Sequence, residues 1–583
     1  MNGTKGEDTT MEAMKIYQQW LADFADDPQT IADLKAIEND PAEIEDRFYR
    51  ELEFGTAGMR GVLGAGTNRL NIYNVRRVTR ALAKYILTTP DGKDKGVAIA
   101  YDSRNMSDVF AKQAALVLCA AGVKVFLYES LRPVPVLSFT IRHLKCIAGI
   151  VITASHNPKQ YNGYKAYWTD GGQMPPESVK GITDRLPETT YAEARPMEEK
   201  EALEKGLLTY IGKEVDDAYI AAVKKLSVNP ELAREMGKTL KIVYTPLHGS
   251  GNLPVRRIFR EIGMENVYVV PQQELPDGNF PTVKVPNPED PAAFALALEM
   301  QKQLGADLCV GTDPDCDRVG IACMTENGPR LLNGNQIGCV LLHYILSQKK
   351  QRGTLPANAA AVTTIVSTDM ARAIAQSFGC EMIEVLTGFK YIAEQIHLFE
   401  TTGSHTFQFG FEESFGYLSG TDVRDKDGVN ACMLIAEAAA WYKKTYNCTL
   451  VDAIDRLYEE YGYYGDKVTS FVLPGKDGLA KIQEVMTGLR ENPPAEFGGV
   501  KVTALRDYLK SLRTQGGRTE QLTLPKSNVL YFEMEGGAWL CVRPSGTEPK
   551  IKLYVNAVTA SAEETRRQLD KISDAAVKLL ESL

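Results

Sequence analysis

Several features that mark other protein classes are missing from this 583-residue chain. No run of about 18 apolar residues occurs, so we expect no membrane span. Residues 1–10 are polar and acidic with no apolar core, so we expect no signal peptide. The ten cysteines are scattered without a C-x-x-C pair, which predicts a reduced, cytoplasmic protein. The net charge of −9 lacks the basic excess that nucleic-acid binding requires.

The composition that remains is that of an ordinary globular protein. Hydrophobic residues make up 44% of the chain and charged residues 24%. A chain of this length exceeds what one hydrophobic core supports, which predicts roughly three to four domains. Residues 11–50, rich in Ala, Glu and Asp, predict polar helices that pack on the outside.

Apolar strand-like segments alternate with helical segments from about residue 70 to residue 330, and the pattern resumes near residue 361. Because parallel strands are buried on both faces, such an alternation predicts parallel α/β sheets. The predicted strands are 97–101, 124–128, 150–152, 241–244, 267–270, 308–310 and 361–366.

The last part of the chain has a different pattern. Segments 529–534 and 538–542 predict a hairpin through a turn that contains two glycines. A closing helix is predicted to begin at Ser561, with Glu564 three residues later as a capping box. This helix presents an apolar face at helical spacing, and the region is therefore predicted to be an α+β domain. The face consists of Leu569, Ile572, Ala576, Leu579, Leu580 and Leu583.

A serine is placed at the end of a predicted buried strand. Residues 147–152 are apolar, Ser155 follows, and Pro158 prevents the strand from continuing. Open α/β sheets carry their chemistry at such strand ends. The G-x-S-x-G elbow is absent, which disfavours a Ser-His-Asp hydrolase. Together with the candidate metal loop later in the chain, Ser155 is better interpreted as a phosphoryl acceptor. Lys165 lies close enough in sequence to lower the pKa of a substrate hydroxyl or accept its proton. An ordinary loop serine and a solvated lysine are the alternatives.

Three aspartates alternate in a loop that follows the strand at 308–310. In an extended loop Asp313, Asp315 and Asp317 would face one side. Carboxylates at close range repel one another, and a divalent cation such as Mg²⁺ relieves that repulsion. An EF-hand is excluded, because Arg318 and Met324 occupy the positions where glycine and glutamate are needed. A solvated acidic turn is the alternative to a metal site.

Two later loops concentrate polar groups. Glu412, Glu413 and Ser414 lie between glycines at a predicted strand end. Adjacent glutamates in an extended segment face opposite sides, which makes them poor candidates for a glycosidase acid/base pair. One glutamate together with Ser414 is suited to bind neighbouring hydroxyls of a sugar, and a purely structural loop is the alternative.

The second loop, residues 543–550, joins a guanidinium, two hydroxyls and a glycine turn. Such a composition suits a phosphate clamp, with a plain polar turn as the alternative. Lys390, after Thr387 and Gly388, adds another candidate cation near a turn.

These segments, in this order, resemble the α-D-phosphohexomutase superfamily of phosphoglucomutases and phosphomannomutases. The likeness covers about residues 45 to 560, and four sequence motifs carry it. They are T-A-S-H-N-P at 153–158, D-x-D-x-D-R at 313–318, E-E-S-F-G at 412–416 and R-P-S-G-T-E-P at 543–549. The segment 54–61 is similar to the N-terminal active-site strand of the family, with Arg60 near the transferring phosphate.

The resemblance implies an α/β fold of four domains around a central cleft, three related α/β units and a C-terminal α+β domain that grips phosphate. We expect a helical extension at 1–45, α/β domains at 46–212, 213–332 and 333–465, and the α+β domain at 466–583. The implied roles are catalysis by Ser155, Lys165, Arg60 and His156; metal binding by Ser155, Asp313, Asp315 and Asp317; substrate binding by Arg318, Thr387, Gly388, Lys390, Glu412 and Ser414; and phosphate binding by Arg543, Ser545, Gly546 and Thr547.

The resemblance also implies a reaction. Phosphorylated Ser155 would donate its phosphoryl group to a sugar monophosphate, and the bisphosphate would return its other phosphate to the serine. We expect one Mg²⁺ per chain, glucose 1,6-bisphosphate as activator and intermediate, small sugar phosphates as partners, and a monomer or weak dimer. The glutamate-glutamate-serine loop favours glucose, which predicts a phosphoglucomutase. A phosphopentomutase, a phosphomannomutase, a glucose-1,6-bisphosphate synthase, a metal-dependent phosphatase and a non-catalytic phosphoprotein of the same fold remain alternatives.

Overall fold

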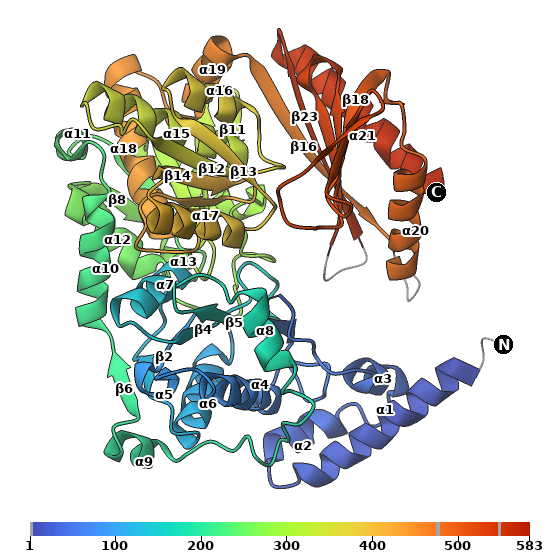
Figure 1. The fold of residues 1–583 in the computed structure, drawn as a ribbon. Coiled ribbons are helices and arrows are strands. Elements are labelled where there is room, and N and C mark those ends of the chain that lie inside the picture. The colour runs from blue at the N-terminus through green and yellow to red at the C-terminus, as the bar shows by residue number, and fades with distance from the viewer. Residues whose placement is uncertain (1–3, 57, 474–477, 546–549, 583) are drawn as a thin grey trace. The chain divides into compact units, whose positions relative to one another are not determined.

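The structure is a computed structural model that describes residues 4–56, 58–473, 478–545 and 550–582 (Figure 1). The chain folds into two compact units. The first unit contains Met1–Leu331 and Gly416–Ala440, and the second contains Leu332–Phe415 and Trp441–Leu583. Over these described stretches, no helix is both long enough and apolar enough to cross a membrane.

Three helices form the N-terminal extension of the first unit. They are α1 (Thr4–Asp23), α2 (Pro28–Lys35) and α3 (Pro41–Phe48). Asp27 begins α2, because its carboxylate accepts the backbone N–H groups of Gln29 and Thr30. The helices share an aromatic core in which Trp20 packs edge-on against Phe48, so the predicted polar helices also have a buried side.

The first α/β domain is built on a six-stranded sheet in the order β1-β5-β4-β2-β3-β6. Strands β4, β2, β3 and β6 are parallel, and β5 runs antiparallel to both β4 and β1. The strands are β1 (Gly58–Val62), β2 (Val97–Tyr101), β3 (Val125–Tyr128), β4 (Ala148–Ile152), β5 (Tyr161–Trp168) and β6 (Leu208–Ile211). The helices are α4 (Ile72–Ile86), α5 (Gly92–Lys95), α6 (Ser107–Ala120), α7 (Val134–His143), α8 (Pro176–Thr183) and α9 (Glu199–Glu204).

Helices cover both faces of this sheet at β4. Ile150 belongs to the same apolar core as Phe110 of α6. The next side-chain position, Gly149, faces the opposite way, where a Cβ atom would lie 2.3 Å from Ile141 of α7. A Cβ atom at this position would fit only if the Ile141 side chain moved, and β4 is buried along its whole length.

The second α/β domain repeats this arrangement with the strand order β11-β10-β9-β7-β8. Strands β9, β7 and β8 are parallel, and β10 returns antiparallel to β9. The strands are β7 (Lys241–Thr245), β8 (Asn266–Val269), β9 (Leu308–Thr312), β10 (Val319–Thr325) and β11 (Gly328–Leu332). The helices are α10 (Lys213–Lys225), α11 (Pro230–Met236), α12 (Asn252–Ile262), α13 (Pro271–Glu274), the 3-10 turn η1 (Pro291–Phe294) and α14 (Ala295–Leu304).

A third α/β domain lies in the second unit and shows the same core order, β13-β12-β14. Both neighbours of β12 run parallel to it. The order of the parallel strands matches β3-β2-β4 and β8-β7-β9, so the expectation of three related α/β domains is confirmed. The elements are α15 (Gly334–Gln351), β12 (Ala359–Thr364), α16 (Met370–Ser377), β13 (Glu381–Val385), α17 (Phe389–Thr402), β14 (Thr406–Glu412) and α19 (Leu450–Tyr461), with β15 (Gly416–Leu418) and α18 (Gly428–Tyr446) between β14 and α19 in the chain.

The C-terminal domain is the predicted α+β domain, with its strands in the order β16-β23-β22-β21-β18-β19-β20 and β17 beside β18. One sheet face packs on α20 and α21, and the other packs on Ile365, Val366 and Leu386 of the third domain. The elements are β16 (Tyr463–Val472), α20 (Gly478–Glu491), β17 (Glu496–Phe497), β18 (Val500–Asp507), β19 (Leu512–Gln515), β20 (Arg518–Gln521), β21 (Leu530–Met534), η2 (Glu535–Gly537), β22 (Trp539–Pro544), β23 (Lys550–Thr559) and α21 (Ala562–Ser582).

The predicted hairpin and closing helix are present, with one correction. Strands β21 and β22 pair antiparallel, and α21 buries its predicted apolar face except for Leu579, which is half-buried, and Leu583, which lies outside the described residues. The Oγ of Ser561 accepts the backbone N–H of Glu564 at 3.3 Å, as a capping box requires. The backbone N–H of Ser561 instead donates to the hydroxyl of Thr559 at 3.3 Å, so the reciprocal half of the capping box was wrong. The hydroxyl of Thr559, two residues earlier, occupies the position that the Glu564 carboxylate would take in a capping box.

Candidate active site

The serine loop and the aspartate loop meet in the first unit. Each follows the parallel strand that has an antiparallel neighbour in its sheet, the serine loop after β4 and the aspartate loop after β9. The hydroxyl of Ser155 donates to Oδ2 of Asp313 at 2.7 Å. Thr153 in the same loop donates to Oδ2 of Asp315 at 3.1 Å. Two residues that are 158 positions apart in the sequence are thereby in direct contact.

The backbone of Ser155 has an unusual conformation. Its φ of 52° lies in the left-handed region, which costs an L-residue about 1 kcal/mol. The backbone N–H of Ser155 donates to Oγ1 of Thr153 at 2.8 Å, and Ser155 is only 4% exposed. Strain that the surrounding structure holds in place is typical of functional positions.

The three aspartates converge as predicted, but the loop that carries them is not extended. Their ligand atoms lie within 4.8 Å of one another, and all three residues are buried. The loop turns at Pro314 and at Cys316, whose φ is 52°, and the N–H of Cys316 donates to the carbonyl of Asp313 at 2.9 Å. The expected alternation of an extended segment was therefore the wrong reason for the convergence, because a tight turn brings the carboxylates together.

The aspartates are in different electrostatic states. Burial, followed by repulsion from Asp315 and Asp317, raises the pKa of Asp313 well above its usual range. Burial also opposes ionisation of Asp315, but the ammonium group of Lys165 and the hydrogen bond with Asp313 hold its pKa below the usual value. Within the described part of the chain, the buried Oδ1 atoms of Asp315 and Asp317 have no hydrogen-bond partner. Unpartnered carboxylate oxygens in a close cluster are the donor set that a hard divalent cation takes.

Two lysines face this cluster. Nζ of Lys165 on β5 lies 2.9 Å from Oδ2 of Asp315 and 3.7 Å from Oδ2 of Asp317. Burial acts to lower the pKa of Lys165, but the two aspartates outweigh it, and the net shift is upward. Lys426 was missed by the sequence reasoning, and its Nζ lies 3.2 Å from Oδ2 of Asp317. The dense run of charges at residues 424–427, directly before an apolar helix, was the available signal.

The other predicted residues of the first unit lie around the serine loop. Arg60 is on β1, which pairs with β5, and its Nη1 donates to Oδ1 of Asn157 at 3.0 Å. Nδ1 of His156 lies 3.1 Å from Oγ of Ser155. Burial, with the charges of Arg318 and Arg60, lowers the pKa of His156 to about 2, so its imidazole is neutral. Arg318 forms an ion pair with Glu289.

A second residue missed from the sequence is Arg104, which follows β2. It is 3% exposed and donates hydrogen bonds to the backbone of the serine loop. Its position at the carboxyl end of a predicted parallel strand, in the run Asp102-Ser103-Arg104, could have identified it.

The predicted sugar-binding residues lie in the second unit. Thr387 and Gly388 lie between β13 and α17, where Gly388 has a φ of 126° that favours glycine. The Oγ1 atom of Thr387 is buried and, among the described residues, has no hydrogen-bond partner. Nζ of Lys390 lies 4.8 Å from the ring centre of Tyr391. Glu412, at the end of β14, is 5% exposed.

Glu413 follows Glu412 and lies in the turn after β14. Its Oε2 accepts the hydroxyl of Thr364 at 3.2 Å. Burial and the neighbouring Glu412 raise the pKa of Glu413 to about 7, against the attraction of Lys552. Ser414 is half-buried in the same turn.

Part of the predicted phosphate clamp is described. Arg543 lies on β22, opposite Lys552 on β23. The N–H of Ser545 donates to the carbonyl of Lys550 at 2.8 Å and closes the base of the loop. Gly546 and Thr547 lie outside the described residues. The clamp residues that are described therefore share one end of the β22–β23 hairpin.

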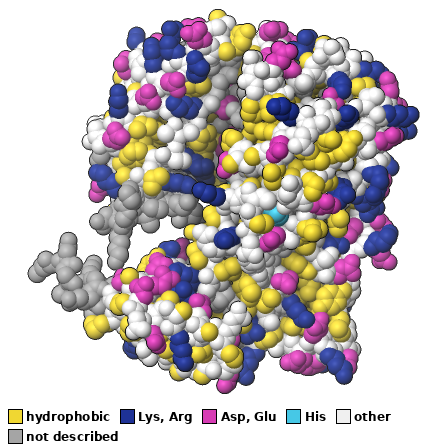
Figure 2. Space-filling model, turned by 180° about the vertical axis from the view of Figure 1, so that it is seen from behind, with side chains coloured by type: hydrophobic (Ala, Val, Ile, Leu, Met, Phe, Trp, Pro, Cys, Tyr) yellow, Lys and Arg dark blue, Asp and Glu magenta, His cyan; other side chains and the backbone are white. Residues whose placement is uncertain are grey.

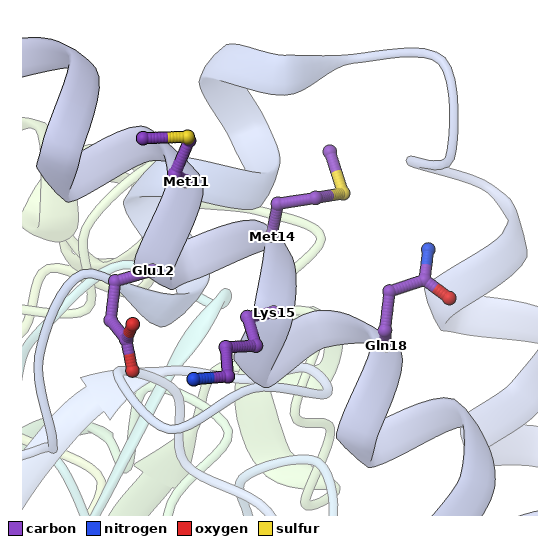
Figure 3. Close-up of a pocket in the computed structure, with 5 residues that line it drawn as sticks. All are labelled: Met11, Glu12, Met14, Lys15 and Gln18. Atoms are coloured by element: carbon purple, nitrogen blue, oxygen red, sulfur yellow. The ribbon is translucent and has the colours of Figure 1, made fainter.

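The molecular surface can be compared with these loops for concentrated charge and for pockets. On the face in Figure 2, Lys and Arg side chains are interspersed with Asp and Glu side chains. One open pocket is lined by five residues of α1 alone, whose side chains fan out from the helix (Figure 3). None of these five residues belongs to the predicted site. They are Met11, Glu12, Met14, Lys15 and Gln18.

Comparison with known proteins identifies the family. The four domain models of the phosphoglucomutase/phosphomannomutase family match residues 51–193, 217–328 and 333–461 for the three α/β/α domains, and 491–575 for the C-terminal domain. The phosphoglucomutase of Staphylococcus aureus (strain bovine RF122 / ET3-1) is 37% identical over 535 residues, covering 91% of this chain and 93% of that protein. A second phosphoglucomutase, from Staphylococcus aureus (strain MRSA252), is 36% identical over 538 residues, covering 91% of this chain and 94% of that protein.

Solved structures show the same fold. A phosphoglucomutase/phosphomannomutase family protein from Burkholderia thailandensis superposes with a TM-score of 0.63 at 20% identity, covering 91% of this chain and 97% of that one. The open form of the exocytosis-sensitive phosphoprotein parafusin from Paramecium superposes with a TM-score of 0.65 at 16% identity, covering 91% and 95%. The resemblance seen in the sequence is confirmed, and the chain belongs to the phosphoglucomutase/phosphomannomutase family.

Proposed function

We propose that this protein is a phosphoglucomutase that interconverts glucose 1-phosphate and glucose 6-phosphate through a phosphoserine at Ser155 and a glucose 1,6-bisphosphate intermediate. One observation carries the proposal: the Ser155 hydroxyl lies 2.7 Å from a buried carboxylate of the aspartate cluster. The curated relatives at 36–37% identity are phosphoglucomutases, and they match about nine-tenths of the chain. They favour glucose over the mannose and pentose alternatives.

The aspartate cluster fits a magnesium ion. Asp313, Asp315 and Asp317 would hold it together with the phosphorylated Ser155, because two of their buried oxygens lack partners among the described residues. When bound, Mg²⁺ would supply positive charge that offsets the charge of the transferring phosphoryl group.

The residues around the serine have distinct proposed roles. In the forward step the bond between phosphorus and Oγ of Ser155 breaks, a bond between phosphorus and the sugar hydroxyl oxygen forms, and the proton of that hydroxyl passes in net terms to Oγ of Ser155. Lys165 is a cation in this environment, since the aspartates raise its pKa, and it would lower the pKa of the attacking hydroxyl. This favours the first of its two predicted roles over acceptance of the proton. Arg60 and Arg318 would orient the phosphoryl oxygens, and the neutral His156 would hydrogen-bond near Oγ.

The loops of the second unit would recognise the rest of the substrate. We propose that Glu412 and Ser414 bind sugar hydroxyls and that Thr387, Gly388 and Lys390 support them. Arg543, Ser545, Gly546 and Thr547 would bind the phosphate that is not reacting. A guanidinium gives a fork of donors that matches phosphate oxygens.

We also propose a cytoplasmic location, because all ten cysteines are free thiols and nine of them are buried. Activation by glucose 1,6-bisphosphate is part of the same proposal, since that compound would restore the phosphoserine. The expectation of a monomer or weak dimer stays a prediction.

Replacement of Ser155 tests the mechanism. Ser155→Ala should lower kcat for glucose 1-phosphate at least 1000-fold, a rough magnitude for loss of a nucleophile, while substrate still binds. Ser178→Ala is the matched control, because Ser178 is a buried serine of the same domain outside the site. Intact mass spectrometry after incubation with glucose 1,6-bisphosphate should show phosphorylation of the wild type and of the control only.

A near-wild-type rate for Ser155→Ala would contradict the phosphoserine mechanism. Comparison of kcat/KM for glucose 1-phosphate, mannose 1-phosphate and ribose 1-phosphate, with Mg²⁺ and catalytic glucose 1,6-bisphosphate, tests the sugar. A preference for ribose 1-phosphate would make the enzyme a pentomutase. Release of inorganic phosphate at the rate of substrate consumption would indicate a phosphatase.

A further inference from the structure

One buried guanidinium holds most of the serine loop. Nη2 of Arg104 donates to the carbonyl of Ser155 at 2.6 Å and also donates to the carbonyl of Asn157. Nε reaches the carbonyl of Ser155 at 3.2 Å. Nη1 donates to the carbonyls of Pro158 and Tyr161, each at 3.0 Å. Four backbone carbonyls, three in the serine loop and that of Tyr161 at the start of β5, thus converge on a single side chain.

Arg104 is itself fixed from several sides. Oδ1 of Asp102 accepts the backbone N–H of Arg104 at 2.9 Å and the hydroxyl of Ser107 at 2.8 Å. The carboxylate of Asp102 lies 3.6 Å from Nε of Arg104. The ring of Phe280, from the second domain, covers the guanidinium at 5.0 Å. The side chain therefore has one orientation, with its donors directed at the loop.

The loop needs such a partner. Residues 153–160 belong to no strand or helix. The carbonyls of Ala154, Pro158 and Gln160 accept backbone N–H groups, whereas those of Ser155 and Asn157 accept none from the described residues. Buried carbonyls without partners are costly, and Ser155 in addition has a left-handed φ. A guanidinium offers five donors in a rigid plane, whereas a lysine offers three donors on one flexible nitrogen.

We propose that Arg104 is a positioning residue: by holding the carbonyls of the serine loop it keeps Oγ of Ser155 directed at Asp313 during phosphoryl transfer. This proposal rests on the proposed phosphoserine mechanism. Arg104 acts through Ser155. Its loss should therefore slow the chemical step and leave substrate affinity unchanged, since the proposed sugar and phosphate contacts are made by other residues.

The variant Arg104→Lys tests this proposal, because it keeps the positive charge and removes the planar set of guanidinium N–H donors. The matched control is Arg77→Lys. Arg77 in the same unit also donates to backbone carbonyls, those of Leu186 and Thr189, far from the serine in sequence. We expect Arg104→Lys to lower kcat by about 100-fold, the scale of a 1 Å misplacement, with KM changed less than threefold. Arg77→Lys should keep kcat within about threefold of the wild type.

A second readout separates positioning from general stability. A misdirected phosphoserine should lose phosphate to water more often, so the ratio of inorganic phosphate released to isomer formed should rise in Arg104→Lys. Melting temperatures of both lysine variants give their stability independently. A kcat within threefold of the wild type, or a loss equal to that of Arg77→Lys, would overturn the proposal. A rise in KM with unchanged kcat would do the same.

Should Arg104→Lys show no cooperative melting transition, Phe280→Leu takes its place. It removes the ring over the guanidinium and leaves every hydrogen-bonding group in position. We expect about a 10-fold lower kcat with unchanged KM, and a wild-type kcat would overturn the proposal. The two tests fail independently. Activity of Ser155→Ala would refute the phosphoserine mechanism, whereas wild-type activity of Arg104→Lys would refute only the positioning role of Arg104.

Discussion

The serine–aspartate region of the first unit and the proposed sugar-binding loops of the second unit, at residues 387–390 and 412–414, differ in how their polar groups are hydrogen-bonded. In the first region the chain supplies the partners: Ser155 donates to Asp313, and Lys165 pairs with Asp315. In the second region Thr387 carries a buried hydroxyl with no partner among the described residues. Glu413 there has a pKa raised to about 7 by burial and by Glu412.

This difference fits a division of labour. Groups that act on a transferring phosphoryl group gain most from being fixed before the substrate arrives, because no reorganisation is then needed in the reaction. Groups that recognise a ligand are completed by the ligand itself. The comparison predicts that changes in the first region lower kcat, whereas changes in the second region alter affinity or stability.

The largest effect is expected for Asp313→Asn. The mutation removes one charge from the proposed metal site and should lower kcat at least 1000-fold, a rough magnitude for loss of a metal ligand and of the Ser155 contact. Burial and neighbouring charges already favour a proton on Asp313 in the metal-free protein, so the neutral asparagine should fold normally. Melting temperature measured with EDTA should match the wild type, and only the wild type should gain stability when Mg²⁺ is added.

Stabilisation of the asparagine variant by Mg²⁺, to the same extent as the wild type, would contradict the assignment of Asp313 to the metal. A suitable control is Asp570→Asn, because Asp570 forms a surface ion pair with Lys467 in the C-terminal domain. That variant should retain both the activity and the effect of Mg²⁺.

A smaller effect, and on a different parameter, is expected for Arg543→Ala. Loss of the guanidinium should raise KM for glucose 1-phosphate about 10- to 100-fold, since charge-assisted hydrogen bonds contribute about 1.5–3 kcal/mol each. The value of kcat should change much less. Steady-state kinetics measure both parameters, with Arg518→Ala on the exposed strand β20 as control. An unchanged KM would place the phosphate clamp elsewhere.

The smallest effect concerns Glu413 and depends on pH. Its folded-state pKa of about 7 exceeds the ordinary 4.5, so folding favours the protonated form. The stability that this group contributes is present below about pH 4.5 and is lost as pH rises through 7. Glu413→Gln cannot ionise and should therefore be more stable than the wild type at pH 8, by an amount on the order of 1 kcal/mol.

Urea unfolding at pH 8 and at pH 5 measures this difference, which should shrink at the lower pH. Glu496→Gln, at the exposed position of β17, is the control and should show no pH-dependent change. An equal difference at both pH values would show that ionisation of Glu413 is not its cause.

Much of the architecture could be predicted from the sequence because the local signals agreed. Apolar runs bounded by turn residues located β2, β4, β7 and β9, and both functional loops follow strands of this kind. Spacing alone suggested that Asp313, Asp315 and Asp317 would converge, although the assumed extended conformation was wrong. The left-handed Cys316 that creates the turn carries no local signal, because cysteine rarely adopts that conformation.

Arg104 and Lys426 were missed for a common reason. Each is a cation whose role depends on a segment distant in sequence: Arg104 on the serine loop 51 residues later, and Lys426 on Asp317. A surface lysine or arginine gives the same local pattern. The strand end before Arg104 and the charge run around Lys426 are the local signals, and burial among carbonyls or carboxylates separates these two cations from surface ones.

The sequence by itself determined the succession of α/β and α+β regions, the strand ends proposed to carry the chemistry and the positions of the serine and aspartate loops. These depend on hydrophobic periodicity and turn chemistry, which act over a few residues. The tertiary structure alone decided that Ser155 contacts Asp313, that Lys165 and Lys426 share the aspartates, and that Arg104 holds the loop. Those contacts join residues far apart in the chain. They form only when the chain has folded, and they are stronger there because packing excludes water and lowers the local dielectric constant.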